Sequence, residues 1–140
     1  MPGGETDGRS GGTILLQRHF TRENLPQLRA QVEDTAASAG LGGVRLGEFT
    51  LAVSEIAANA VEHAGGHGRL ELRQLQDELE CRITDKGPGF VPAIPELLPG
   101  LTEDCPGRGL WLARLVTDRL TVTTHDAGAG AEVTLAMRLH

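Results

Sequence analysis

The feature that most constrains this fold is a long segment, about 44–64, whose apolar residues recur at helical spacing. At about 100° per residue, one side of that helix collects the apolar side chains and the opposite edge collects polar ones. The apolar side consists of Val53, Ile56, Ala57, Ala60 and Ala64. A helix with one apolar side must bury it against another element, so we expect this segment to cover a sheet.

The other periodic segments predict that sheet and two more helices. We expect strands at about 13–20, 68–76, 79–84, 119–125 and 131–139, and helices at about 25–39 and 109–118. Strands and helices do not alternate, which excludes a Rossmann pattern. We predict an α+β fold, a two-layer α/β sandwich whose mixed, mostly antiparallel sheet is covered on one face by about three helices. Residues 1–12 are expected to be a flexible tail, and 13–140 a single domain.

Composition excludes several classes of function. The net charge is −6, and three Phe and one Trp are the only aromatic residues, which argues against nucleic-acid binding. Lys86 is the only lysine, and no P-loop motif exists. A bound nucleotide would therefore have its phosphates held by backbone amides, arginine and a metal ion.

The chain also lacks visible export signals. Cys81 and Cys105 stand alone, without a C-x-x-C pattern, which suits a reducing compartment. The first residues show no signal-peptide pattern, and no apolar run approaches about 18 residues. We expect a cytoplasmic protein.

The polar edge of the long helix carries Glu55 and Asn59, about 40° apart and one turn from each other. Such an edge is ordinary for a solvated helix face. The alternative is a carboxylate and a carboxamide oxygen directed at a metal-bound polyphosphate, since amide oxygens are suitable ligands for Mg²⁺.

Two glycine motifs are each compatible with simpler roles. Asp85, Gly87 and Gly89 follow a strand, where a β-turn explains the same residue types. Gly107–Leu110 opens the helix at 109–118, where free amides favour an anion but a flexible hinge is the simpler interpretation. Between the motifs, the proline-rich segment 91–106 is expected to form a functional loop or lid.

In this fixed order, the three motifs resemble the GHKL ATPase superfamily, which includes gyrase and the histidine kinases. The matching patterns are E-x-x-x-N-A-x-x-H at 55–63, D-x-G-x-G at 85–89 and G-x-G-L at 107–110. The chain looks most like the small bacterial anti-sigma-factor serine kinases. The resemblance covers about 13–139 and implies the Bergerat nucleotide-binding fold.

The resemblance also implies a role for individual residues, with ATP and Mg²⁺ as cofactors. Glu55 would be the general base, and Asn59 would bind the Mg²⁺ that bridges the phosphates. Asp85 would accept a hydrogen bond from the adenine amino group. Arg29 would contact phosphate or a partner protein. The remaining cofactor-binding residues would be His63, Gly87, Gly89, Gly107, Arg108, Gly109 and Leu110.

One position departs from the family pattern. The family usually places threonine or serine just before the valine of the last strand, near the aspartate that contacts adenine. Here the sequence reads Gly130-Ala131-Glu132-Val133, with no hydroxyl until Thr134. The departure bears on adenine binding and on whether kinase activity is retained.

Two functions follow as expectations. In the first, the protein is an ATP-dependent serine kinase that phosphorylates a STAS-type anti-anti-sigma protein and sequesters a sigma factor, with a homodimer as a further expectation. In the second, it is a non-catalytic, nucleotide-gated regulatory binding module. The retained Glu55 favours the first, and the missing hydroxyl before Val133 favours the second.

Overall fold

The computed structural model describes residues 12–63, 66–85, 108–124 and 131–139. Its elements are β1 (Thr13–Thr21), the 3-10 turn η2 (Arg22–Asn24), α1 (Leu25–Ala39), α2 (Gly43–His63), β2 (His67–Leu75), β3 (Glu78–Asp85), α3 (Arg108–Val116), β4 (Arg119–Thr124) and β5 (Ala131–Arg138). The expected order is confirmed, with each end within two residues of the sequence-based expectation. The η2 turn was not predicted. Apart from Gly12, the predicted tail lies outside the described residues.

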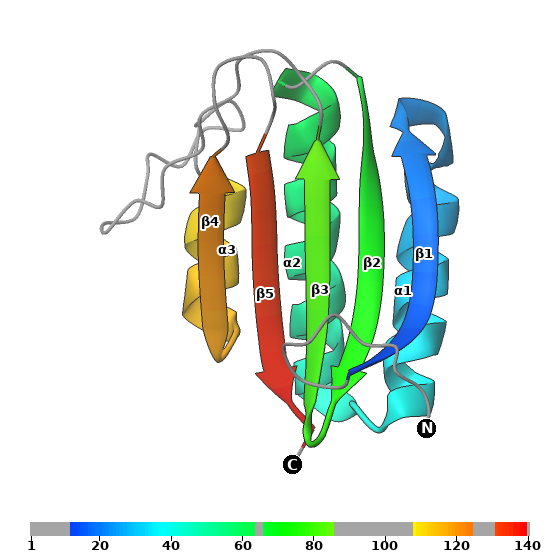
Figure 1. Cartoon of the computed structure of the whole chain (residues 1–140), viewed down its shortest axis with the longest axis vertical. Helices are drawn as coiled ribbons and strands as arrows, with labels where there is room; N and C mark the ends of the chain where they lie inside the picture. Colours follow the sequence, from blue (N-terminus) through cyan, green and yellow to red (C-terminus); the bar gives the residue numbers. More distant parts are fainter. Residues whose placement is uncertain (1–11, 64–65, 86–107, 125–130, 140) are drawn as a thin grey trace.

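The strands form one five-stranded sheet in the order β1-β2-β3-β5-β4. Each pairing in the described part of the chain is antiparallel. The three helices lie together against one face of this sheet, and the other face carries no helix among the described elements (Figure 1). The predicted two-layer α+β sandwich is therefore confirmed.

The core lies between α2 and the middle strands. The apolar side of α2 is buried as its spacing predicts, at Val53, Ile56, Ala57 and Ala60. Strand residues from the helix-covered face complete the cluster, including Phe20, Leu70, Leu72, Ile83, Val133, Leu135 and Met137. Ala64, the last residue of the predicted apolar side, lies outside the described residues. Within the described ranges, no helix combines the length and apolar character needed to cross a membrane.

Gly40 ends α1 in the left-handed conformation, with φ of 115°. Its backbone N–H donates to the carbonyl oxygens of Ala36 and Ala37, which closes the last helical turn. The next residue, Leu41, donates to the Ala36 oxygen at 3.1 Å and is itself buried. A side chain at position 40 would strain this turn, so glycine fixes where the chain leaves α1 and reverses into α2.

The cysteine that the structure describes belongs to this core. Cys81 lies on β3 and is fully buried. Burial raises the pKa of its thiol far above the ordinary value, with the nearby Glu80 and Glu71 carboxylates adding to the shift. Cys81 is therefore an inert packing residue. Cys105 lies outside the described residues.

The face of the sheet that the helices leave open is built from ion pairs. Arg119 of β4 contacts Glu78 and Glu80 of β3 at 2.7 and 3.3 Å. The hydrogen bond to Glu78 raises the pKa of Arg119. On the same face, Arg82 of β3 forms an ion pair with Glu132 of the neighbouring β5, with Nε to Oε2 at 3.1 Å. Alternating residues along the middle strands β2 and β3 thus place most charges on one face and the core on the other.

Asp118 lies in the turn between α3 and β4 and connects three elements through hydrogen bonds. One carboxylate oxygen accepts the backbone N–H of Arg138 at 2.7 Å and Nη2 of Arg45 at 3.0 Å. The same Arg45 nitrogen donates to the Arg138 carbonyl at 2.8 Å. The backbone hydrogen bond from Arg138, helped by Arg45, lowers the pKa of Asp118. The start of α2, the α3–β4 turn and the end of β5 are held together in this way.

We predict that Asp118→Ala lowers the free energy of unfolding by about 1 kcal/mol at pH 7, because both hydrogen bonds are lost. The modest size reflects the 38% exposure of the Asp118 side chain. Since the folded pKa is lowered from 3.8, the contribution is complete above that pH and disappears as pH falls through the folded value. Urea denaturation of both proteins between pH 7 and pH 2 measures this. A difference that stays constant down to pH 2 would contradict the assignment.

Candidate functional site

The fold brings several chain segments to one end of the sandwich. Figure 1 shows the C-terminal end of α2, the end of β3, the start of β5 and the N-terminal end of α3 at the top of the view. The N-terminal end of α1 lies at the same end. Because the predicted motifs sit on these ends, Asn59, Asp85 and the start of α3 belong to one region of the molecule.

Glu55 and Asn59 lie on α2 on the side away from the sheet. Both are half-buried, while their neighbours Ile56, Ala57 and Ala60 are buried in the core. The rotation of α2 is fixed by that core, so the two polar side chains are held outward, one helical turn apart. Both remain accessible to a ligand or a partner.

Asp85 is a buried acid at the end of β3, and the residue is only 3% exposed. It continues the strand positions of Cys81 and Ile83, which are in the core, so it belongs to the helix-covered face. A buried carboxylate is costly unless polar groups satisfy it. The burial of Asp85 therefore argues against the simpler interpretation of its motif, which is an ordinary surface turn.

Asp85 stands in a cross-strand row of four positions. Its partners are Gly68 on β2 and Ala131 on β5, and Ala131 is in turn paired with Thr124 on β4. A Cβ at Gly68 would lie 2.7 Å from Phe20 Cζ and 3.0 Å from the Thr84 carbonyl oxygen. Glycine is required there by close packing. The result is a small residue on each side of Asp85.

The row also includes part of the Ala131-Glu132 stretch, where the family resemblance leads us to expect a hydroxyl residue. Ala131 is directly opposite Asp85 and is buried. Thr134 pairs with Arg82 on the open face, so it does not supply the missing hydroxyl beside Asp85. Neither Gly68 nor Thr124 was predicted as a site position. Strand register, which the sequence pattern does not fix, is what brings them into one cross-strand row with Asp85.

The other predicted residues either lie on the three helices or fall outside the described residues. Arg29 is exposed on α1, in its N-terminal half. His63 is the last residue of α2, and Arg108, Gly109 and Leu110 are the first three of α3, as the G-x-G-L motif predicts. Gly87, Gly89, Gly107 and the predicted lid 91–106 lie outside the described residues.

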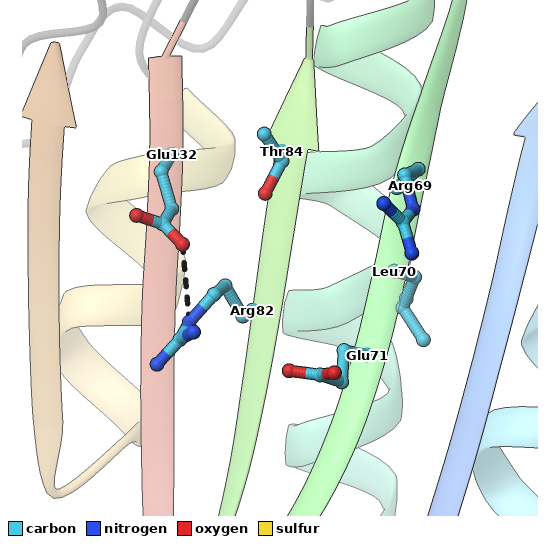
Figure 2. Close-up of a pocket in the computed structure, with 6 residues that line it drawn as sticks. All are labelled: Arg69, Leu70, Glu71, Arg82, Thr84 and Glu132. Atoms are coloured by element: carbon cyan, nitrogen blue, oxygen red, sulfur yellow. Dashed lines mark ion pairs between the residues drawn. The ribbon is translucent and has the colours of Figure 1, made fainter. Parts of the chain in front are cut away.

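A separate pocket of about 260 Å³ lies on the open face of the sheet. It is lined by Arg69, Leu70, Glu71, Arg82, Thr84 and Glu132 (Figure 2). The dashed contact in Figure 2 is the Arg82–Glu132 ion pair. Glu71 accepts a hydrogen bond from Gln17 Nε2 at 2.9 Å and contacts Arg73 at 3.4 Å. None of the predicted site residues lines this pocket, whose carboxylates contact protein cations.

Comparison with known families identifies the class of domain. The family model of the histidine kinase-like ATPase domain matches residues 19–137. The chain therefore belongs to the histidine kinase-like ATPase family, whose domains bind ATP, typically with Mg²⁺. Among curated proteins, none matches the sequence of this chain.

A solved structure shares the fold. It comprises the RsbU and RsbW domains of Rv1364c from Mycobacterium tuberculosis, with a TM-score of 0.60 and 18% sequence identity. The match covers 88% of this chain and 32% of that chain, so the chain spans about a third of the matched protein.

We predict that Gly68→Ala lowers the free energy of unfolding by about 1–3 kcal/mol, because the added methyl overpacks against Phe20 and the β3 backbone. Gly47→Ala is the matched control. A Cβ there meets nothing within 4 Å, so alanine should leave stability unchanged or raise it by up to about 1 kcal/mol. Chemical denaturation compares the two. Equal stability changes would contradict the close packing beside Asp85.

Proposed function

We propose that this chain is an ATP-binding anti-sigma factor and protein serine kinase that phosphorylates a STAS-type anti-anti-sigma partner. The observation that carries the proposal is the placement of Asn59 and Asp85 at one end of a histidine kinase-like ATPase domain. We take residues 13–140 as that domain and the cytoplasm as its location. The RsbW domain in the structurally similar protein supports the choice within the family.

Adenine recognition rests on Asp85. Its carboxylate is buried, so a donor that reaches it is bound away from competing water. An adenine amino group is such a donor, and the small residues Gly68 and Ala131 beside Asp85 suit a flat ring. Gly87 and Gly89 would shape the rest of this pocket.

The residues also suit a magnesium–polyphosphate complex. Among the described residues there is no cluster of three or more His, Cys, Asp or Glu that would hold a metal alone. Mg²⁺ does not need one, because it keeps several waters and takes substrate phosphates with one or two protein oxygens. The half-buried Asn59 amide offers such an oxygen. Bound Mg²⁺ would offset phosphate charge, while the backbone N–H groups of Gly107 to Leu110 would donate hydrogen bonds to the phosphate oxygens.

The position of Glu55 on α2 supports it as the base. It lies one turn from Asn59 on the accessible edge of α2, so its carboxylate faces the side from which a partner hydroxyl would approach. The serine oxygen forms a bond to the γ-phosphorus, and the bond from that phosphorus to the ADP oxygen breaks. The hydroxyl proton passes to the Glu55 carboxylate. Arg29, exposed on α1, is proposed to contact the partner protein or the bound sigma factor.

A second candidate function has one specific observation in its favour. Ala131, in the Ala131-Glu132 stretch that lacks the family's usual hydroxyl, stands opposite Asp85, so a polar contact on the adenine side would be missing. A domain with weakened nucleotide binding would act as a regulatory module that holds its partner without phosphorylating it.

We predict that Asp85→Asn weakens ATP binding roughly tenfold or more, because the amide presents a donor where an acceptor is needed. The control is Asp77→Asn, an exposed turn residue between β2 and β3. Titration calorimetry with ATP and Mg²⁺ measures both variants, and circular dichroism checks that they fold. No binding by the parent up to millimolar ATP would contradict the proposal.

We predict that Glu55→Gln separates catalysis from binding. The rate of phosphate transfer should fall about 10²–10⁴-fold, because the proton acceptor is lost, while ATP affinity stays unchanged. Asn59→Ala should reduce both, because it removes the metal ligand. Glu33→Gln, an exposed change on α1, is the control and should alter neither.

Single-turnover transfer from labelled ATP to the partner measures these rates. A Glu55→Gln variant as fast as the parent would show that Glu55 is not the base. A parent that binds its partner but never transfers phosphate would favour the regulatory module.

A further inference from the structure

The outward side of α2 carries two parallel rows of residues at seven-residue spacing. The apolar row is Val44, Leu51 and Ala58, and the acidic row, four residues further along, is Glu48, Glu55 and Glu62. Residues seven apart drift only about 20° around a helix, so each row stays nearly straight along α2. An offset of four residues puts the two rows side by side, about 40° apart.

The apolar row is exposed. Val44 is 76% and Leu51 39% exposed, both large aliphatic side chains on a helix whose other side is buried in the core. Ala58 is exposed as well, and a Cβ at Gly47 would meet nothing within 4 Å. The described part of the chain thus leaves this side of α2 uncovered, with small residues that permit close approach of another helix.

An exposed apolar row beside a row of like charge is complemented by a partner helix that carries apolar side chains beside opposite charges. Where two helices pack in this way, apolar side chains pack along the seam and the charged residues beside it contact opposite charges on the partner helix. The flanking charges here are all acidic. The complementary surface is therefore an amphipathic helix with an apolar row edged by Lys or Arg.

Glu55 lies within the acidic row. Leu51 precedes it by one turn, about 6 Å along the helix axis. Glu48 and Glu62 stand about two turns, or roughly 10 Å, on either side. A general base must come within hydrogen-bond distance of the hydroxyl that it deprotonates. A helix seated on Leu51 and paired with Glu48 would hold a neighbouring hydroxyl over Glu55.

We infer that the two rows on α2 are the docking surface for the substrate protein, which binds through a basic amphipathic helix next to its phosphorylated serine. The inference rests on the proposed kinase function. It adds where the partner sits, which residues recognise it and what chemistry the partner must present.

The test uses the purified full chain and each STAS-domain protein of the source organism as substrate. With a substrate that the parent phosphorylates, Leu51→Ser should raise KM roughly tenfold or more with little change in kcat. Glu48→Gln should raise KM several-fold, and the difference from the parent should shrink with added salt. Ile14→Ser and Glu33→Gln change an exposed aliphatic residue and an exposed acid elsewhere, and should match the parent. ATP affinity should be the same in all five proteins.

The outcomes separate the two proposals. If Leu51→Ser and Glu48→Gln phosphorylate the substrate with the parental KM, the docking surface is wrong and the kinase function stands. If these variants lose capture of a sigma factor but keep the parental KM, the rows belong to that partner, and the inference is likewise overturned. If the parent neither binds nor phosphorylates any STAS-domain protein, both the function and the docking surface are wrong.

Discussion

Burial of one side of α2 against the sheet is the interaction on which the rest of this structure depends. Val53, Ile56, Ala57 and Ala60 all enter the core, and a helix fixed along this side cannot rotate. Its polar edge is therefore held outward, with Asn59 near the end of the sandwich where Asp85 lies. Among the described residues, Val44, Leu51 and Ala58 stay exposed on the opposite side of α2. One apolar contact surface thus fixes the orientation of both the polar edge and the exposed side of α2.

Strand alternation divides the sheet in a comparable way. On the last residues of β3, Thr84 faces the open side and Asp85 the helix-covered side, and Glu132 and Ala131 do the same on β5. The open-face pocket and the buried Asp85 therefore lie back to back on neighbouring residues of these strands. On the open face, charges pair with charges across strands. On the helix-covered face, the buried Asp85 lies between the small residues Gly68 and Ala131, and we therefore propose that face as the better place for a specific polar ligand.

Most of the fold could be predicted from the sequence because its signals are local. Helical spacing marks α2, and glycines end α1 and α2. What could not be predicted depends on contacts between distant residues. Arg45 reaches the Arg138 carbonyl across 93 positions, and strand register alone places Gly68 and Ala131 beside Asp85. The candidate residues Glu55, Asn59 and Asp85 came from motif order, whereas the exposed rows on α2 needed the observed burial of its other side.

The central claim is that adenine nucleotide binds at the Asp85 end of the helix-covered face. An amide-resolved NMR titration of the full chain with ATP and Mg²⁺ tests it most directly. We expect the largest shift changes at the end of β3, the start of β5 and the C-terminal turns of α2, and small changes at Glu71 and Arg82 in the open-face pocket. Saturable changes centred on Glu71 and Arg82, with the Asp85 and Asn59 amides unmoved, would contradict this account.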